Sequence, residues 1–195
     1  MTYKYEQPFL KRYETERLYL RIVDETYTDA ILTFLNQGAG IFDEYEAEKP
    51  SDYYTRATQQ RILLTEQEMA SQKTGVRFYV FKKDNPKVII GTVSVFSIFH
   101  KPSEYANLGY KFLPEHWHQG YATEALKKVI ELVGPIMKLK YLEAYVLPVN
   151  LSSRRLLARL GFDLGERRLS KLEIKGAQKD HFLYRYNYKK TSFRK

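Results

Sequence analysis

The chain has 195 residues, of which 44% are hydrophobic and 28% charged, a balance typical of a folded globular domain and not of a disordered or collagen-like chain. It contains no cysteine, which excludes a disulfide framework, a cysteine-ligated metal site and a covalent acyl intermediate on a thiol. The 32 Lys and Arg against 23 Asp and Glu give a net charge of +9, which suits nucleic acid, an acidic protein surface or a phosphorylated co-substrate equally well.

The organisation of the chain is simple. No internal repeat and no Pro/Gly/Ser-rich linker divides it, so we expect one domain over residues 1–195 with flexible ends at 1–12 and 189–195. The first residues lack the apolar core of a signal peptide, and no later stretch approaches about 18 uninterrupted apolar residues. We therefore expect a cytoplasmic protein without membrane contact.

The first half of the chain combines strand and helix patterns. The stretch that begins at Thr15 alternates apolar and polar positions, as a half-buried strand does. The stretch after Ser51 has no Gly or Pro and is rich in helix-forming residues, so it should hold one or two helices closed by Gly75. Two β-branched and aromatic runs flank Asp84-Asn85-Pro86 and predict an antiparallel hairpin. In chain order we expect a strand at 15–22, helices within 29–36 and 51–73, and hairpin strands at 76–81 and 88–99.

The second half of the chain continues with alternating elements. After Gly120, apolar residues recur at helical spacing through Val133, which predicts an amphipathic helix. Gly161 should end a second helix. We expect strands at 105–113 and 141–147, a helix at 151–160, and closing strands around 168–174 and 181–188.

A glycine turn precedes the first of these two helices, in the segment His116-Trp117-His118-Gln119-Gly120-Tyr121-Ala122-Thr123. The first N–H groups of a helix have no partner within it, and the helix dipole adds partial positive charge there. Gly120 lets the backbone approach a ligand closely, so a diphosphate fits this turn. The absence of a Gly-x-x-x-x-Gly-Lys run and of three spaced glycines argues against both common nucleotide folds. A glycine turn without a ligand is the alternative.

Two motifs resemble the GCN5-related N-acetyltransferases (GNAT). Residues 108–126 resemble motif A of that superfamily, and residues 150–162 resemble the Asn-x-x-Ser and Leu-Gly-Phe motif of its ribosomal-protein N-terminal acetyltransferase (RimJ/RimL-type) branch. Residues 15–21 and 180–184 fit the same branch, so the resemblance spans nearly the whole chain. It implies an α/β (α+β) fold, a single GNAT-type domain with a mixed and mostly antiparallel twisted sheet flanked by helices.

The resemblance also implies acetyl-CoA as co-substrate and no metal. The pantetheine arm would lie along the backbone of Phe112 and Leu113. Asn150 would contact the co-substrate arm, although an Asn before a helix is also an ordinary N-cap. The pyrophosphate would contact the amides of His118, Gln119, Gly120, Tyr121, Ala122 and Thr123.

The catalytic roles are implied residue by residue. The backbone N–H of Phe112 is the expected oxyanion donor. Many relatives place a tyrosine acid where this chain has Leu157, so Ser153 is the candidate donor to the leaving thiolate, with a capping hydroxyl as the alternative and Tyr184 as a weaker candidate. Relatives often carry a glutamate base where this chain has Asn107, which we place among the substrate-binding residues because an amide cannot accept a proton from an ammonium ion.

The sequence allows more than one assignment for the general base and for the residues that line the acceptor groove. Glu104, Glu143 or Glu44 acting through water is one reading of the base, and an acceptor that arrives deprotonated is another. Glu44 and Glu46 belong to an acidic cluster where the family builds a wall of the acceptor groove, so both are candidate substrate-binding residues; a solvated loop is the alternative.

The expected function is acetyl transfer from acetyl-CoA directly to a primary amine, with a ribosomal protein N-terminus as one acceptor. A small-molecule amine or antibiotic acetyltransferase is an alternative, and a catalytically silent acyl-CoA-binding module is another, because Asn107 and Leu157 replace two expected catalytic types. Basic residues crowd the last third of the chain, which leaves contact with nucleic acid or the ribosome open. Monomer and homodimer are equally compatible with the sequence.

Overall fold

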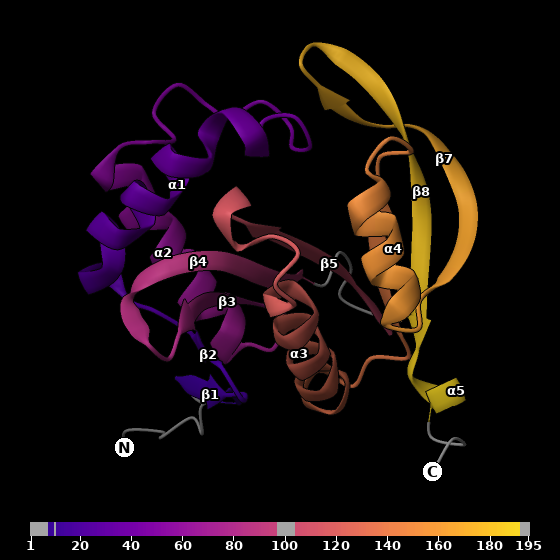
Figure 1. Ribbon diagram of the computed structural model, residues 1–195, viewed down its shortest axis with the longest axis horizontal. Helices are drawn as coiled ribbons and strands as arrows, with labels where there is room; N and C mark the ends of the chain where they lie inside the picture. Colours follow the sequence, from indigo (N-terminus) through magenta and orange to yellow (C-terminus); the bar gives the residue numbers. More distant parts are fainter. Residues whose placement is uncertain (1–7, 10, 97–103, 192–195) are drawn as a thin grey trace.

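The computed structural model describes residues 8–9, 11–96 and 104–191. They form one eight-stranded sheet in the order β1-β2-β3-β4-β5-β6-β8-β7, in which β5 and β6 are parallel and all other neighbours are antiparallel. The expected mixed and mostly antiparallel sheet flanked by helices is confirmed (Figure 1). The strands are β1 Arg12–Glu14, β2 Leu18–Arg21, β3 Gly75–Lys82, β4 Asn85–Phe96, β5 Tyr105–Phe112, β6 Tyr141–Val146, β7 Asp163–Ile174 and β8 Ala177–Asn187.

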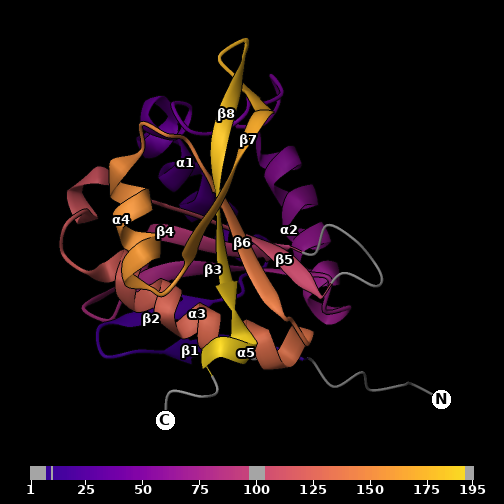
Figure 2. The same cartoon turned by 90° about the vertical axis from the view of Figure 1, so that its right-hand side faces the viewer.

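Helices cover both faces of the sheet. Side chains of β3 alternate between two hydrophobic clusters: Phe78 packs in the cluster that contains α3, and Phe81 packs in the cluster that contains α1. Figure 2 shows α2 on one side of the central strands and α3 with α4 on the other. The helices are α1 Thr28–Phe42, α2 Arg56–Ser71, α3 Tyr121–Met137, α4 Leu151–Arg159 and the short α5 Tyr188–Thr191, with 3-10 turns at Glu25–Tyr27 and Pro114–His116. None of the described helices is long and apolar enough to cross a membrane.

Some element boundaries differ from the sequence expectation. The first strand is shorter than 15–22, because Thr15 N–H donates to Leu18 O and closes a turn between β1 and β2. Helix α1 continues past residue 36 because the ring of Phe42 covers Gly38 and packs 5.3 Å from the ring of Phe34. A single helix, α2, lies within 51–73, and Gly75 opens β3 and does not close the helix. Of the strand expected at 88–99, residues 97–99 lie outside the described residues.

Some residues near the two ends of the chain take part in the fold. Phe9 is 3% exposed and packs edge-on against Phe78, with ring centroids 6.0 Å apart. Arg12 begins β1, and residues 189–191 belong to α5. These residues thus take part in the described structure, whereas residues 1–7, 10 and 192–195 lie outside it, and flexibility of the ends at 1–12 and 189–195 stays a prediction.

A buried ion pair fixes α2 against the sheet. Arg77 on β3 lies 2.7 Å from Glu66 on α2, and the Tyr79 hydroxyl donates to the same carboxylate at 3.1 Å. Burial raises the pKa of Glu66 even though Arg77 opposes that shift. Removing one charge would leave the other buried without its partner.

We predict that Glu66→Gln lowers the free energy of unfolding by about 3 kcal/mol, because the Arg77 charge is left uncompensated. Glu14→Gln is the matched control, since the Arg12–Glu14 pair is exposed and such pairs contribute at most about 1 kcal/mol. Urea denaturation followed by circular dichroism measures both, and equal losses in the two variants would contradict the prediction.

Candidate functional site

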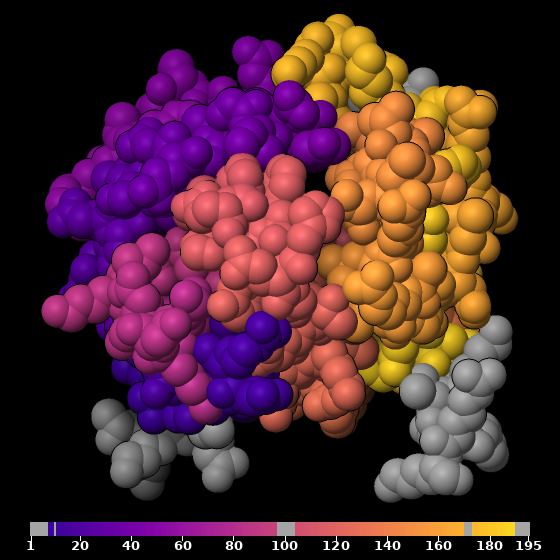
Figure 3. Space-filling model, viewed as in Figure 1, coloured from indigo at the N-terminus to yellow at the C-terminus, as the bar shows by residue number. Residues whose placement is uncertain are grey.

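A cavity lies where β5 and β6 separate. The two strands pair in parallel over three residue pairs that end at Asn107↔Glu143. β5 then continues to Phe112 beside β4, whereas β6 continues to Val146 beside β8. A cavity of about 680 Å³ occupies this fork. Figure 3 shows the surface hollowed where the end of α1, the turn before α3 and the start of α4 meet.

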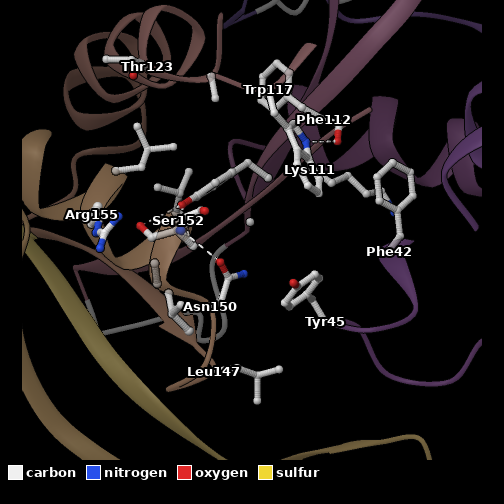
Figure 4. A pocket seen from close by; sticks show the side chains of 18 of the residues that line it. Phe42, Tyr45, Lys111, Phe112, Trp117, Thr123, Leu147, Asn150, Ser152 and Arg155 are labelled. Atoms are coloured by element: carbon white, nitrogen blue, oxygen red, sulfur yellow. Dashed lines mark hydrogen bonds between the residues drawn. The ribbon is translucent and has the colours of Figure 1, made fainter. Parts of the chain in front are cut away.

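The edge of β5 offers backbone N–H groups to the fork. Leu113 donates its N–H to Ile90 O of β4 at 3.0 Å. Successive residues in an antiparallel ladder direct their N–H groups to opposite edges, so those of Tyr110 and Phe112 face the fork. The amide of Leu113 is therefore committed to β4, and Phe112 is the member of the expected pair whose amide faces the cavity. Its carbonyl accepts a hydrogen bond from Trp117 Nε1 at 2.7 Å (Figure 4).

The turn after β5 has the backbone shape of an anion site. His118 and Gly120 both adopt left-handed conformations, with φ of 58° and 83°. Such residues draw successive N–H groups toward one point. Within the described part of the chain, no side chain caps the N-terminus of α3, so its first N–H groups have no side-chain partner there. Ala122 and Thr123 line the cavity beside them, whereas Tyr121 is buried beneath.

A network from the first strands holds this turn in place. Glu124 accepts hydrogen bonds from Thr15 Oγ1 at 2.5 Å, Arg17 N at 2.8 Å and Arg17 Nε at 2.7 Å. Arg17 also donates to the carbonyl of Gln119 at 3.0 Å. Burial raises the pKa of Glu124, but these hydrogen bonds outweigh burial and leave it below its ordinary value. Glu124 therefore stays ionised and positions the turn.

Helix α4 brings a hydroxyl to the opposite wall. Asn150 Oδ1 accepts the N–H of Ser153 at 3.0 Å, which makes Asn150 the N-cap of α4 while it also lines the cavity. The Ser153 hydroxyl lies 2.6 Å from the Tyr110 hydroxyl. Burial raises the pKa of Tyr110 to about 12, so this phenol keeps its proton at neutral pH.

The other candidate acids lie elsewhere. Leu157 is fully buried in the core. Tyr184 is 4% exposed, and its hydroxyl accepts a hydrogen bond from Arg154 Nε at 3.3 Å, so it lies beneath α4 and not on the cavity wall. Of the two expected hydroxyls, Ser153 is the one that lines the cavity.

The third wall comes from the end of α1 and the residues that follow it. Figure 4 shows Phe42 and Tyr45 across the cavity from Asn150. Glu46 lines the cavity too, but it lies 2.9 Å from Lys111 Nζ and 2.7 Å from Lys49 Nζ. The expected anionic wall is thus a carboxylate shared by two ammonium groups.

Other expected acceptor-side residues lie around or outside the cavity. Glu44 is exposed and does not line it. Asn107 stands at the base of the fork, where its Oδ1 is buried without a hydrogen-bond partner among the described residues. Glu143 lies 2.5 Å from Arg185, and Glu104 pairs with Lys140. The last two carboxylates are thus neutralised by neighbouring cations.

Several cavity residues were not expected from the sequence. Tyr110 and Lys111 belong to β5, as Phe112 does. The alternation of side chains along this strand was the sequence signal that could have indicated them. Arg155 and Arg159 lie about one helical turn apart on α4, and His181 lies on β8. No group of three or more His, Asp or Glu side chains that could hold a metal occurs among the described residues.

The basic residues of the last third are partly neutralised along the β7–β8 hairpin. Arg167 lies 2.5 Å from Asp180, and Arg168 lies 3.3 Å from Glu166. Arg185 is engaged by Glu143.

Comparison with known proteins places this geometry in a family. Residues 17–163 match the model of the acetyltransferase (GNAT) domain. The chain is 29% identical over 164 residues to the probable N-acetyltransferase YjcK of Bacillus subtilis, covering 84% of this chain and 90% of that protein. Similar solved folds include the ribosomal-protein-S5-alanine acetyltransferase of Vibrio fischeri (TM-score 0.84, 24% identity, 90% of this chain and 96% of that one). Another is Mycobacterium smegmatis RimJ in complex with CoA-disulfide (TM-score 0.81, 22% identity, 89% and 83% coverage). The family match spans most of the chain, which is therefore a member of the GNAT acetyltransferase family.

Proposed function

We propose that this chain transfers the acetyl group of acetyl-CoA directly to a primary amine, and that its acceptor is the N-terminus of a protein. The observation that carries the proposal is the presence of two separate sets of backbone donors at one cavity, the Phe112 amide on the β5 edge and the uncapped start of α3. A thioester with a diphosphate at the far end of its arm needs donors of these two kinds, separated by a groove.

The residues present fit acetyl-CoA. The amides of the left-handed turn, from His118 to Thr123, would bind the diphosphate, and the edge of β5 at Phe112 would bind the pantetheine arm. Arg155 and Arg159 add positive charge to the same cavity wall, where phosphate oxygens would accept hydrogen bonds. The similar structures of Mycobacterium smegmatis RimJ and of the microcin C7 self-immunity acetyltransferase MccE are complexes with CoA-disulfide and with acetyl-CoA and AMP, which supports this assignment.

The chemistry follows from where the donors lie. The N–H of Phe112 would stabilise the negative charge that develops on the thioester oxygen. Ser153, whose hydroxyl contacts the Tyr110 hydroxyl, would donate a proton to the departing sulfur. Neither role needs a covalent intermediate on the protein, in accord with a chain that has no cysteine.

The acceptor assignment rests on the relatives and on the open third wall of the cavity. The Vibrio fischeri protein is named a ribosomal-protein-S5-alanine acetyltransferase, and its fold matches most of this chain. Phe42 and Tyr45 present an apolar surface beside Glu46 and Lys111, on which the first residue of a peptide would rest.

The direct test is release of free CoA from acetyl-CoA in the presence of matched acceptors. We expect peptides with a free N-terminus to be acetylated, and the same peptides with a blocked N-terminus to be inert. Preference for polyamines or aminoglycosides would replace the protein acceptor by a small-molecule one. Acetyl-CoA binding without transfer to any amine would support the silent binding module.

Substitution of the turn glycine tests the co-substrate site. We predict that Gly120→Val weakens acetyl-CoA binding at least about 100-fold, because a side chain at φ of 83° both strains the turn and obstructs the diphosphate. Gly176→Val is the matched control, since Gly176 has φ of 70° with open space around it at the tip of the β7–β8 hairpin. Calorimetry should show loss of affinity in the first variant alone, and equal affinities would count against a diphosphate at this turn.

Substitution of Ser153 tests the proton donor. We predict that Ser153→Ala lowers kcat by about 100-fold with little change in acetyl-CoA affinity, because the departing sulfur loses its donor while the backbone contacts persist. Ser152→Ala removes the neighbouring hydroxyl and should retain most of the activity. Steady-state kinetics with saturating acetyl-CoA measures both, and an unchanged kcat in Ser153→Ala would assign this hydroxyl to structure alone.

A further inference from the structure

One histidine lines the cavity at the end of the fork that is farther from Asn107. His181 is 2% exposed, lies on β8 and lines the cavity. Its neighbour Phe182 pairs with Val146, the last residue of β6, so His181 lies just beyond the end of β6. The unpaired length of β5 therefore faces it across the fork.

Strand alternation places His181 on the same face of the sheet as Lys111. Phe182 and Tyr184 pack in the core cluster that contains α3, as do Tyr110 and Phe112. Side chains in a strand alternate between faces, so His181 and Lys111 both point to the opposite face, which the end of α1 covers. The histidine thus lies on the same side of the sheet as Glu46 and Lys111, opposite the side that α3 and α4 cover. We call this the acceptor side.

A backbone contact decides which ring nitrogen of His181 carries hydrogen. Nδ1 lies 3.0 Å from the carbonyl oxygen of Lys179. A carbonyl oxygen only accepts hydrogen bonds, so Nδ1 is the donor. In the neutral imidazole the lone pair that can accept a proton is then on Nε2.

The other titratable side chains on this side are poor bases. Burial raises the pKa of Glu46, but Lys111 and Lys49 outweigh burial and hold it below its ordinary value. Burial raises the pKa of Tyr145, which stays protonated at neutral pH. Burial lowers the pKa of Lys111 although Glu46 opposes that shift, and its nitrogen donates to both oxygens of Glu46, at 2.9 and 3.0 Å, so it is engaged by that carboxylate.

We propose that His181 is the general base of the transfer, a catalytic residue whose Nε2 takes a proton from the acceptor ammonium. This inference rests on the proposed function. The neutral acceptor nitrogen then forms its bond to the acetyl carbon as the carbon–sulfur bond breaks. Ser153 donates a proton to the departing sulfur, and the second proton lost by the nitrogen replaces it. The proton on His181 passes to solvent, so the reaction releases one proton overall.

The first measurement compares His181→Asn with the unaltered chain. Asn offers an N–H near the position of Nδ1 and so retains a donor to the Lys179 carbonyl, but it cannot accept the proton. We expect kcat/KM for the acceptor to fall by about 100-fold, with acetyl-CoA affinity within about twofold. Gln178→Ala, an exposed substitution on the same strand, is the control and should keep full activity.

The pH profile separates a base from a structural role. A base acts unprotonated, so kcat/KM of the unaltered chain should rise with pH as His181 loses its proton, and His181→Asn should lack that rise. Other charged and titratable groups around this part of the cavity are Arg168, which pairs with His181 from β7, Tyr145 on β6, and Glu46 and Lys111 across the cavity. The same rise in the variant would assign the ionisation to one of those groups or to the acceptor amine itself, and would overturn the proposal.

A second pair of acceptors keeps the test informative if the variant is less stable. An amine that is already neutral at the assay pH needs no base, so the deficit of His181→Asn should shrink to about threefold for it and stay near 100-fold for a matched alkylamine. Equal deficits with both acceptors would overturn the role of His181 but would leave the proposed function in place. Failure of the unaltered chain to acetylate any amine would instead overturn the proposed function, and this assignment with it.

Discussion

The separation of β5 from β6 is the constraint on which the rest of the site depends. A strand edge inside a sheet normally has its N–H groups paired, and an unpaired buried donor is costly. Here the pairing stops at Asn107, and the N–H groups of Tyr110 and Phe112 turn to a cavity instead of a neighbouring strand. The sheet thus leaves open the donors that a bound thioester arm would satisfy. The N–H groups in the first turn of α3, which have no side-chain cap, add further open donors beside the same cavity.

Each wall of this fork is tied to another part of the chain. Glu124 and Arg17 hold the turn before α3 from the first strands. The contact between Ser153 and Tyr110 joins α4 to β5. These contacts cross long stretches of sequence, and each ends at a position next to the cavity. The site is therefore assembled by the same interactions that fix the helices on the sheet.

The sequence predicted the parts of the fold that rest on local patterns. The helix after Gly120, the helix ended by Gly161 and the hairpin around Asp84 follow from periodicity and turn chemistry. The motif resemblance correctly indicated the family. The pairing of Glu46 with Lys111 was not predictable, because it joins residues 65 positions apart through the packing of α1 on the sheet. The commitment of the Leu113 amide to β4 depends on strand register, which short motifs do not encode.

The shared carboxylate of Glu46 has a consequence for any amine that enters this side of the cavity. One negative charge between Lys111 and Lys49 leaves an excess of one positive charge at the wall. A positive field disfavours an ammonium ion relative to the free amine, so it lowers the pKa of an amine held beside it. The wall would therefore act on the ionisation of an amine bound beside it: it would make entry of the charged form harder and make the bound nitrogen easier to deprotonate.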